Sequence, residues 1–258
     1  MSRPTLRRQA LRLGLLASFV VLALSACGGG TAQDEEKAPK IPEAPASQEE
    51  EAQRIPPGKY VSDEFRLAMS FKLGEGWTNW EPGMGPMSQP GEIVETRDSL
   101  SLFTYEERSL ARNPGGFSWL KFMVVRKVYR VISSYEVKTE PAPGDIVAWL
   151  QNNPRLKTEE PQPATIGGEQ GVQFDAVASR VPQDYYGPDY VCEQPCLMLV
   201  KSSGLDFGMF ERSKARFIVL DNVKGETVTI AVSAPAAKFD EFWTKAHQVL
   251  TTVEWKDT

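Results

Sequence analysis

The chain offers few residues suited to covalent or acid–base catalysis. Its 258 residues include a single histidine, His247, whereas most nucleophilic catalytic sets need a histidine as base. His247 follows Ala246 at the edge of a predicted helical stripe, where a structural or surface role is expected. The sequence contains neither a Gly-x-Ser-x-Gly elbow nor a phosphate-binding glycine loop. We therefore predict that the protein is not an enzyme. An envelope hydrolase is the alternative, because glycoside hydrolysis needs little more than paired carboxylates.

Aromatic residues in predicted loops are the candidates for ligand binding. They are Trp77, Trp80, Tyr185, Tyr186 and Tyr190. Aromatic faces can stack on sugars or line an apolar pocket. The alternative is that they cap the ends of the core, as large aromatic residues often do. Acidic residues crowd the region of the three tyrosines, but the Asp-x-Asp-x-Asp pattern of a calcium loop is missing, so neither a metal nor a cofactor is predicted.

Residues 1–26 have the layout of a secretory signal. A basic start with four arginines precedes an apolar run over 13–24, small residues and Cys27. This run is too short for a membrane span of about 20 residues. Leu24-Ser25-Ala26-Cys27 resembles the lipobox of bacterial lipoproteins, which implies cleavage before Cys27 and its modification with a diacylglyceryl group and acyl chains such as palmitate. The protein is therefore expected to be extracytoplasmic and anchored to the cell membrane by a lipid on Cys27.

A second feature of the sequence is the pair Cys192 and Cys196, four positions apart. A redox pair, half of a metal site and a loop staple are all compatible with this spacing. Zinc sites usually need four ligands, and one pair with one distant histidine is a poor match. Because cysteine pairs outside the cytosol usually oxidise, we predict a structural disulfide between Cys192 and Cys196.

Composition divides the chain into three parts. Residues 1–26 hold four arginines and no acid, so the remainder carries 25 basic and 34 acidic side chains, a formal charge of −9. This charge argues against nucleic acid as a partner. Residues 27–57, rich in proline and glutamate, cannot bury enough apolar surface to fold and are predicted to be a disordered tether. Residues 58–258 have the length of a single domain.

Within this domain the hydrophobic pattern predicts strands with two helices. Strands are expected at 67–73, 99–105, 117–131, 164–166, 171–179, 197–201 and, as a hairpin around Val223-Lys224-Gly225, at 216–222 and 226–233. In the last of these, Val228, Ile230 and Val232 are predicted to face inward and the alternating residues outward. A short helix is expected after Asp145 and an amphipathic one after Pro235. We therefore predict an α+β fold, an antiparallel sheet with two helices packed on it.

Several of these segments together resemble a known fold. They are the strand and Gly-x-Gly-Trp turn over 69–77, the Ile166-Gly167-Gly168-x-x-Gly171 hairpin, and the terminal hairpin, helix and strand ending at Val253-Glu254-Trp255. Their order is similar to the PsbP-like fold of actinobacterial envelope lipoproteins of the LpqN type. The resemblance implies a non-enzymatic accessory or binding protein, and no functional residues can be transferred from it.

The expected function is thus that of a membrane-anchored accessory or binding lipoprotein of the cell envelope. Its expected partners are the membrane, through Cys27, and either a small ligand or an envelope protein.

Overall fold

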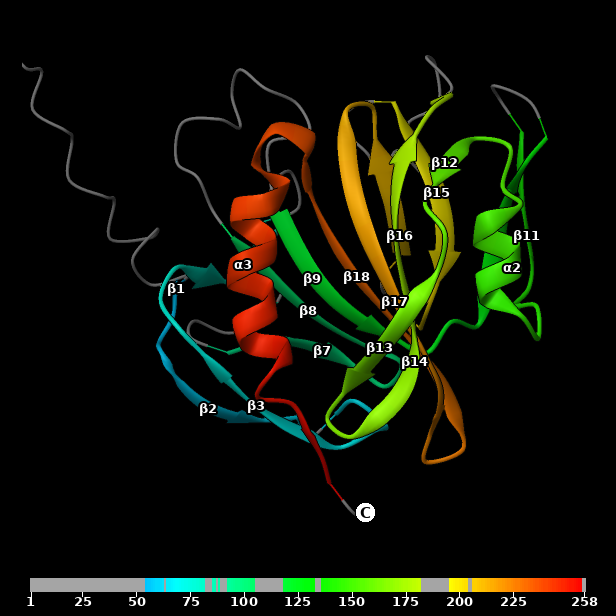
Figure 1. Cartoon of the computed structure of the whole chain (residues 1–258). Helices are drawn as coiled ribbons and strands as arrows, with labels where there is room; N and C mark the ends of the chain where they lie inside the picture. Colours follow the sequence, from blue (N-terminus) through cyan, green and yellow to red (C-terminus); the bar gives the residue numbers. More distant parts are fainter. Residues whose placement is uncertain are drawn as a thin grey trace, which may run out of the picture. The chain divides into compact units, whose positions relative to one another are not determined.

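A large antiparallel sheet forms the centre of the fold (Figure 1). The computed structural model describes residues 54–62, 64–81, 85–86, 88, 92–104, 118–132, 136–181, 195–203 and 206–256. In these residues the sheet has ten strands, eight of them in the order β1-β4-β8-β9-β18-β17-β14-β12, with β7 beside β8 and β13 beside β14. They are β1 (Arg54–Ile55), β4 (Trp77–Thr78), β7 (Val94–Thr96), β8 (Ser99–Thr104), β9 (Ser118–Met123), β12 (Leu156–Thr158), β13 (Gln162–Ile166), β14 (Glu169–Ala178), β17 (Ser213–Val223) and β18 (Glu226–Pro235).

Smaller sheets and two α-helices complete the described part of the chain. A four-stranded sheet has the order β11-β10-β15-β16, a three-stranded sheet the order β19-β3-β2, and β5 pairs with β6. These strands are β2 (Gly58–Val61), β3 (Met69–Leu73), β5 (Trp80–Glu81), β6 (Gly85–Pro86), β10 (Lys127–Val131), β11 (Val137–Pro141), β15 (Cys196–Lys201), β16 (Asp206–Phe210) and β19 (Glu254–Trp255). The helices are α2 (Ile146–Gln151) and α3 (Phe239–Leu250), the latter preceded by a 3-10 turn at Ala236–Lys238.

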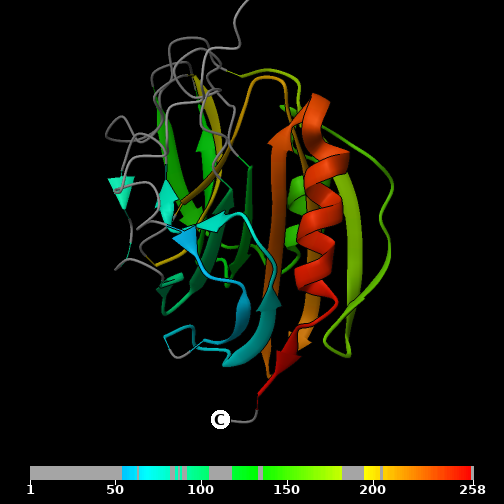
Figure 2. The same ribbon diagram turned by 90° about the vertical axis from the view of Figure 1, so that its left-hand side faces the viewer.

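Both faces of the large sheet are buried. In β17, Ile218 and Leu220 pack into one hydrophobic cluster, and Phe217 and Val219 pack into another. The first cluster also takes in α3 and β3, and the second takes in α2, β15 and β16. Figure 2 shows α3 lying alongside β18, which it contacts. The large sheet is therefore a middle layer with one α-helix on each side.

The prediction of an antiparallel sheet with two helices packed on it is confirmed in part. The fold is α+β only in a loose sense, because sheets dominate it and the two helices belong to different hydrophobic clusters. The predicted half-buried character of β18 is wrong. Thr229, Ala231 and Ser233 are as buried as Val228, Ile230 and Val232, because the four-stranded sheet covers the face that was expected to be exposed.

Two predicted boundaries also change. The single strand predicted over 117–131 is two strands, β9 and β10, which belong to different sheets. The folded domain begins no later than Arg54 rather than after residue 57, because Ile55 pairs with Trp77 in the large sheet and is buried in the core. The remainder of the predicted tether, the signal and Cys27 lie outside the described residues.

The local motifs read from the sequence are confirmed. The β17–β18 hairpin turns at Lys224 and Gly225, with φ of 51° and 87°, and glycine adopts this left-handed conformation without steric cost. On α3 the residues Phe239, Phe242, Ala246, Val249 and Leu250 are buried, as the apolar stripe predicted. The hairpin of β13 and β14 also forms, with Gly167 and Gly168 at its turn.

Candidate functional site

An open pocket between α2 and the β10–β11 ribbon is the best candidate for a binding site in the described part of the chain. Its volume is about 590 Å³, which is within the range of small-molecule sites. It is lined by Tyr129, Arg130, Val131, Glu140, Pro143, Asp145, Ala148, Trp149, Asn152, Asn153, Pro154, Arg155 and Leu197. We call it the α2 pocket.

The helix α2 is placed by its own capping and apolar residues. The Asp145 carboxylate accepts a hydrogen bond from the Ala148 backbone N–H at 2.8 Å, which satisfies a donor of the first turn. Ile146 and Leu150 are buried in the second hydrophobic cluster. This leaves Ala148 and Trp149, both half-buried, at the wall of the pocket. The helix ends at Asn152, whose amide Nδ2 donates to the Ala148 carbonyl at 2.8 Å.

Charged residues of both signs line the α2 pocket. On the β10–β11 wall, Arg130 and Glu140 form an exposed ion pair at 3.3 Å. On the α2 wall, Asp145 precedes the helix and Arg155 follows it. Arg155 donates from Nη1 to the Arg180 carbonyl at 3.2 Å, and its backbone N–H donates to the Asn153 side chain at 3.0 Å. Acidic and basic groups are thus equal in number around the pocket.

The two carboxylates in this pocket bear on the hydrolase alternative. Glu140 is occupied by Arg130, and Asp145 caps α2. A carboxylate that serves as general acid needs an environment that raises its pKa, such as an apolar pocket or a second carboxylate close by. The observed partners of Glu140 and Asp145 are instead a cation and a backbone N–H donor.

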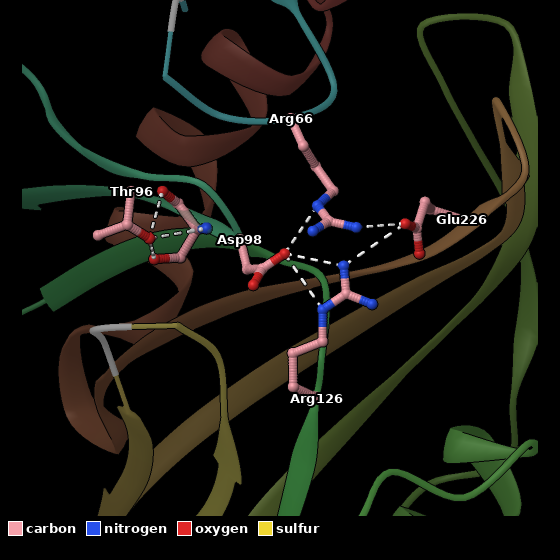
Figure 3. A network of polar contacts seen from close by, with 6 residues as sticks. Arg66, Thr96, Asp98, Arg126 and Glu226 are labelled. Carbon is pink, nitrogen blue, oxygen red and sulfur yellow. Dashed lines mark hydrogen bonds and ion pairs between the residues drawn. The ribbon is translucent and has the colours of Figure 1, made fainter.

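A separate network of charges joins four segments at one end of the large sheet (Figure 3). The Asp98 carboxylate lies 2.7 Å from Arg66 Nε and 2.8 Å from Arg126 Nη2. Glu226 Oε1 lies 2.6 Å from Arg66 Nη1 and 3.4 Å from Arg126 Nη2. Asp98 follows β7, Arg126 lies between β9 and β10, and Glu226 begins β18. The network therefore fixes the ends of several strands and the Arg66 segment to one another.

The Asp98 carboxylate is held in its charged form. Burial raises the pKa of Asp98, but hydrogen bonds from Arg126 and Ser203 and the charges of both arginines outweigh burial, so the pKa lies below its ordinary value. The pKa of Glu226 is lowered in the same way, since the bonds and charges of Arg66 and Arg126 outweigh its burial. The two arginines are balanced by two carboxylates, so the network has a structural role: it holds the four segments together.

A comparable arrangement holds α3 against the sheet. Asp175, with a side chain only 6% exposed, is paired with Lys214 at 2.7 Å and with Arg216 at 2.9 Å. The Arg216 guanidinium lies 4.2 Å from the centre of the Trp243 ring on α3. Burial raises the pKa of Asp175, but hydrogen bonds from Arg216 and Lys214 outweigh it and leave that pKa below its ordinary value.

A buried lysine lies between the large sheet and the four-stranded sheet. Lys121 on β9 is 1% exposed, and its ammonium donates to the Asp206 carbonyl at 3.2 Å. The same ammonium lies 4.8 Å from the centre of the Trp119 ring, a cation–π contact. The hydrogen bond to Asp206 holds β9 to the start of β16.

The structure places the predicted site residues in different surroundings. Trp77 is not available to a ligand: it is 1% exposed and packs edge-on against Phe242, which makes it a core residue. Trp80 belongs to β5, and its side chain lies outside the description. Tyr185, Tyr186, Tyr190, Cys27 and Cys192 lie outside the described residues. His247 is exposed on α3 with its ring 5.2 Å from that of Trp243, as expected for a surface histidine.

The other predicted cysteine, Cys196, begins β15 and is fully buried. It is a disulfide-bonded cysteine. Its predicted partner is outside the described residues, so the pairing of Cys192 with Cys196 stays a prediction.

The α2 pocket is formed by residues that the sequence did not single out. Helical spacing from Ile146 predicts Trp149 on the buried face of a short helix, whereas it is half-buried at the pocket wall. Arg130 and Glu140 come together only through the register of β10 and β11, in which Arg130 lies opposite Lys138 and Val128 opposite Glu140. The sequence signal that could have indicated the pocket is local. Asp145 caps a six-residue helix that ends at Asn152 and Asn153, and so short a helix can leave part of Trp149 exposed.

Comparisons with known proteins give little that bears on this site. No family model and no curated protein matches the chain. Among solved structures, LpqN of Mycobacterium tuberculosis, described as involved in cell envelope biogenesis, is similar at 9% identity and a TM-score of 0.32 over 78% of this chain and 92% of that one. A likeness this low does not establish a shared fold, so the PsbP-like fold stays a prediction.

The part of the chain that the structure describes lacks both a metal-ligand cluster and a membrane-spanning helix. Within it no group of three or more histidine, cysteine or carboxylate side chains could hold a metal ion. None of its helices is long and apolar enough to cross a bilayer.

Proposed function

We propose that this chain is a lipid-anchored, extracytoplasmic binding protein of the cell envelope that acts without catalysis and holds its ligand in the α2 pocket. The anchor is the acylated Cys27 at the end of the lipobox. The segment from Cys27 to residue 53 carries the domain away from the membrane, since its acidic and proline-rich composition disfavours packing.

The pocket itself is the observation that carries this proposal. It combines a volume of about 590 Å³ with two aromatic side chains, two amides and charged groups of both signs. Binding sites commonly consist of a concave wall with a few polar groups that orient the ligand. Its two carboxylates are engaged by Arg130 and by the Ala148 backbone N–H rather than by each other, which supports binding over hydrolysis.

The proposal is tested by thermal shift on the full chain purified in mild detergent. The probes are neutral oligosaccharides, short peptides with free termini, inorganic phosphate, Ca²⁺ and a fatty acid. A ligand that binds only the folded state, at one hundred times its dissociation constant, adds about 2.7 kcal/mol to the free energy of unfolding. At least one probe is therefore expected to raise the melting temperature by several degrees.

The site is identified by a variant that fills the pocket. Ala148→Trp places a large side chain at the pocket wall, and Gln248→Trp, on an exposed position of α3, is the matched control. The shift should persist in the control and vanish in Ala148→Trp, while both variants melt cooperatively. A shift that survives in Ala148→Trp for every active probe, or no shift with any probe, would reject the α2 pocket as a ligand site.

A further inference from the structure

The α2 wall of the pocket has opposite charges at its two ends. Asp145 stands immediately before α2, and Arg155 is four residues after its last residue, Gln151. The six helical residues between them span about 9 Å at 1.5 Å each. Trp149 and Asn152 line the same wall between the two charges. The wall therefore changes from acidic to basic along its length.

These two end charges differ from the others around the pocket. Arg130 and Glu140 on the opposite wall neutralise each other at 3.3 Å. Among the residues that the structure describes, neither Asp145 nor Arg155 takes part in an ion pair. Asp145 uses Oδ1 to cap the helix, and Arg155 uses Nη1 to bind a backbone carbonyl, so each keeps a formal charge without a counter-charge. A complementary ligand would carry a cation at one end and an anion at the other.

We propose that the α2 pocket binds short peptides with free termini. The peptide ammonium lies at Asp145, the carboxylate lies at Arg155, and a central side chain packs on Trp149. An extended peptide rises about 3.3 Å per residue, so three residues match the length of the helical wall. Arginine is suited to the far end because its planar guanidinium can bind a carboxylate through two hydrogen bonds. This assignment rests on the proposed function and specifies its ligand.

The test is a double-mutant cycle between the protein and the peptide. Isothermal titration of the full chain in detergent uses Ala-Leu-Ala, its N-acetyl form and its C-terminal amide. Asp145→Asn removes the acidic charge while keeping an effective helix cap, and Arg155→Gln removes the basic charge. The matched controls are Glu160→Gln and Lys157→Gln, exposed charges near the same wall that do not line the pocket.

The expected result is pairwise coupling. In the unmodified protein, acetylation and amidation should each weaken binding about tenfold, the effect of losing one charge-assisted contact. In Asp145→Asn, acetylation should make no further difference while amidation still does, and Arg155→Gln should show the reverse. Both controls should behave like the unmodified protein. Independent effects of the protein and peptide changes would overturn the assigned orientation and with it the proposal.

The remaining outcomes separate this proposal from the proposed function. If neutral oligosaccharide, phosphate or fatty acid is bound in a manner blocked by Ala148→Trp and the peptides are not, the pocket is a ligand site and the peptide assignment is wrong. If peptides and all other probes fail to bind, both are wrong. Binding of Ala-Leu-Ala that Ala148→Trp leaves unchanged would place the peptide elsewhere and also overturn the assignment.

Discussion

The charge network around Asp98 should make a large contribution to stability, and Asp98→Asn tests this. The substitution keeps the shape of the side chain but removes the negative charge between Arg66 and Arg126. The Asp98 side chain is 6% exposed, whereas those of Arg66 and Arg126 are 23% and 37% exposed. Asp98→Asn would therefore leave two partly buried cations close together with only Glu226 to balance them.

The size of the effect follows from these exposures. Removing one partner of a fully buried ion pair costs about 3–5 kcal/mol. Because both arginines reach solvent, screening reduces the penalty, and we expect a loss of about 2 kcal/mol in the free energy of unfolding. For a domain of this size, 1 kcal/mol corresponds to about 2–4 °C in melting temperature, so the variant should melt about 4–8 °C lower.

The pH dependence provides a second readout. The folded-state pKa of Asp98 is lowered, so its contribution to stability is complete above the unfolded-state value of about 3.9 and is lost as the pH falls through the folded-state pKa. The stability difference between the unmodified protein and Asp98→Asn should thus be constant at neutral pH and narrow under strongly acidic conditions. Urea unfolding followed by tryptophan fluorescence measures it at each pH.

The control is Glu140→Gln, which breaks the exposed pair with Arg130. The Arg130 and Glu140 side chains are 67% and 47% exposed, and exposed ion pairs contribute about 0.2–1 kcal/mol to the free energy of unfolding. If Asp98→Asn costs no more than Glu140→Gln at neutral pH, the network does not stabilise the fold and the reasoning from burial is wrong.

Three further predictions concern the anchor, the disulfide and the close approach of two strands. In the full chain, Cys27→Ala should abolish palmitate incorporation and move the protein from the membrane to the soluble fraction; unchanged membrane association would refute the lipid anchor. Thiol titration of the full chain, isolated from membranes without reductant, should find no reactive thiol, whereas two thiols would contradict a disulfide between Cys192 and Cys196. Gly171→Ala should lower the free energy of unfolding by about 1–3 kcal/mol, because the added Cβ would collide with the Val219 carbonyl of β17, while Gly144→Ala, which meets nothing within 4 Å, should be nearly neutral in urea unfolding.

Local sequence pattern predicted an amphipathic helix and a tight turn. The α3 stripe from Phe239 to Leu250 and the β17–β18 turn at Lys224-Gly225 follow from helical periodicity and turn chemistry alone. The layering of the sheets could not be predicted from such local pattern. Thr229, Ala231 and Ser233 are small or polar, which is typical of a solvent-facing row, yet they are buried because the distant strands β15 and β16 belong to a second sheet over that face.

The α2 pocket could not be predicted for a related reason. Arg130 and Glu140 are ten residues apart on two strands, and their pairing depends on the β10–β11 register. Trp149 has the helical spacing of a core residue from Ile146, but it is half-buried at a pocket wall that faces residues of the distant strands β10 and β11. Conversely, Trp77 follows a glycine turn and was expected in a loop, but pairing of β4 with β1 and β8 places it in the core.

The charged residues that the structure describes include two contrasting groups: buried carboxylates paired with cations, and charges that line the α2 pocket without an ion-pair partner. Asp98 and Asp175 are nearly excluded from water, and each is held by two cations. Such charges cannot bind a ligand without breaking contacts that the fold needs. Asp145 is instead exposed and Arg155 half-buried, and the two have opposite charges at the two ends of the α2 wall and line the α2 pocket. Asp145 caps α2 and Arg155 binds a backbone carbonyl, but among the described residues their opposite charges have no counter-charge, while the charges of the opposite wall neutralise each other. That asymmetry is what a zwitterionic ligand would require.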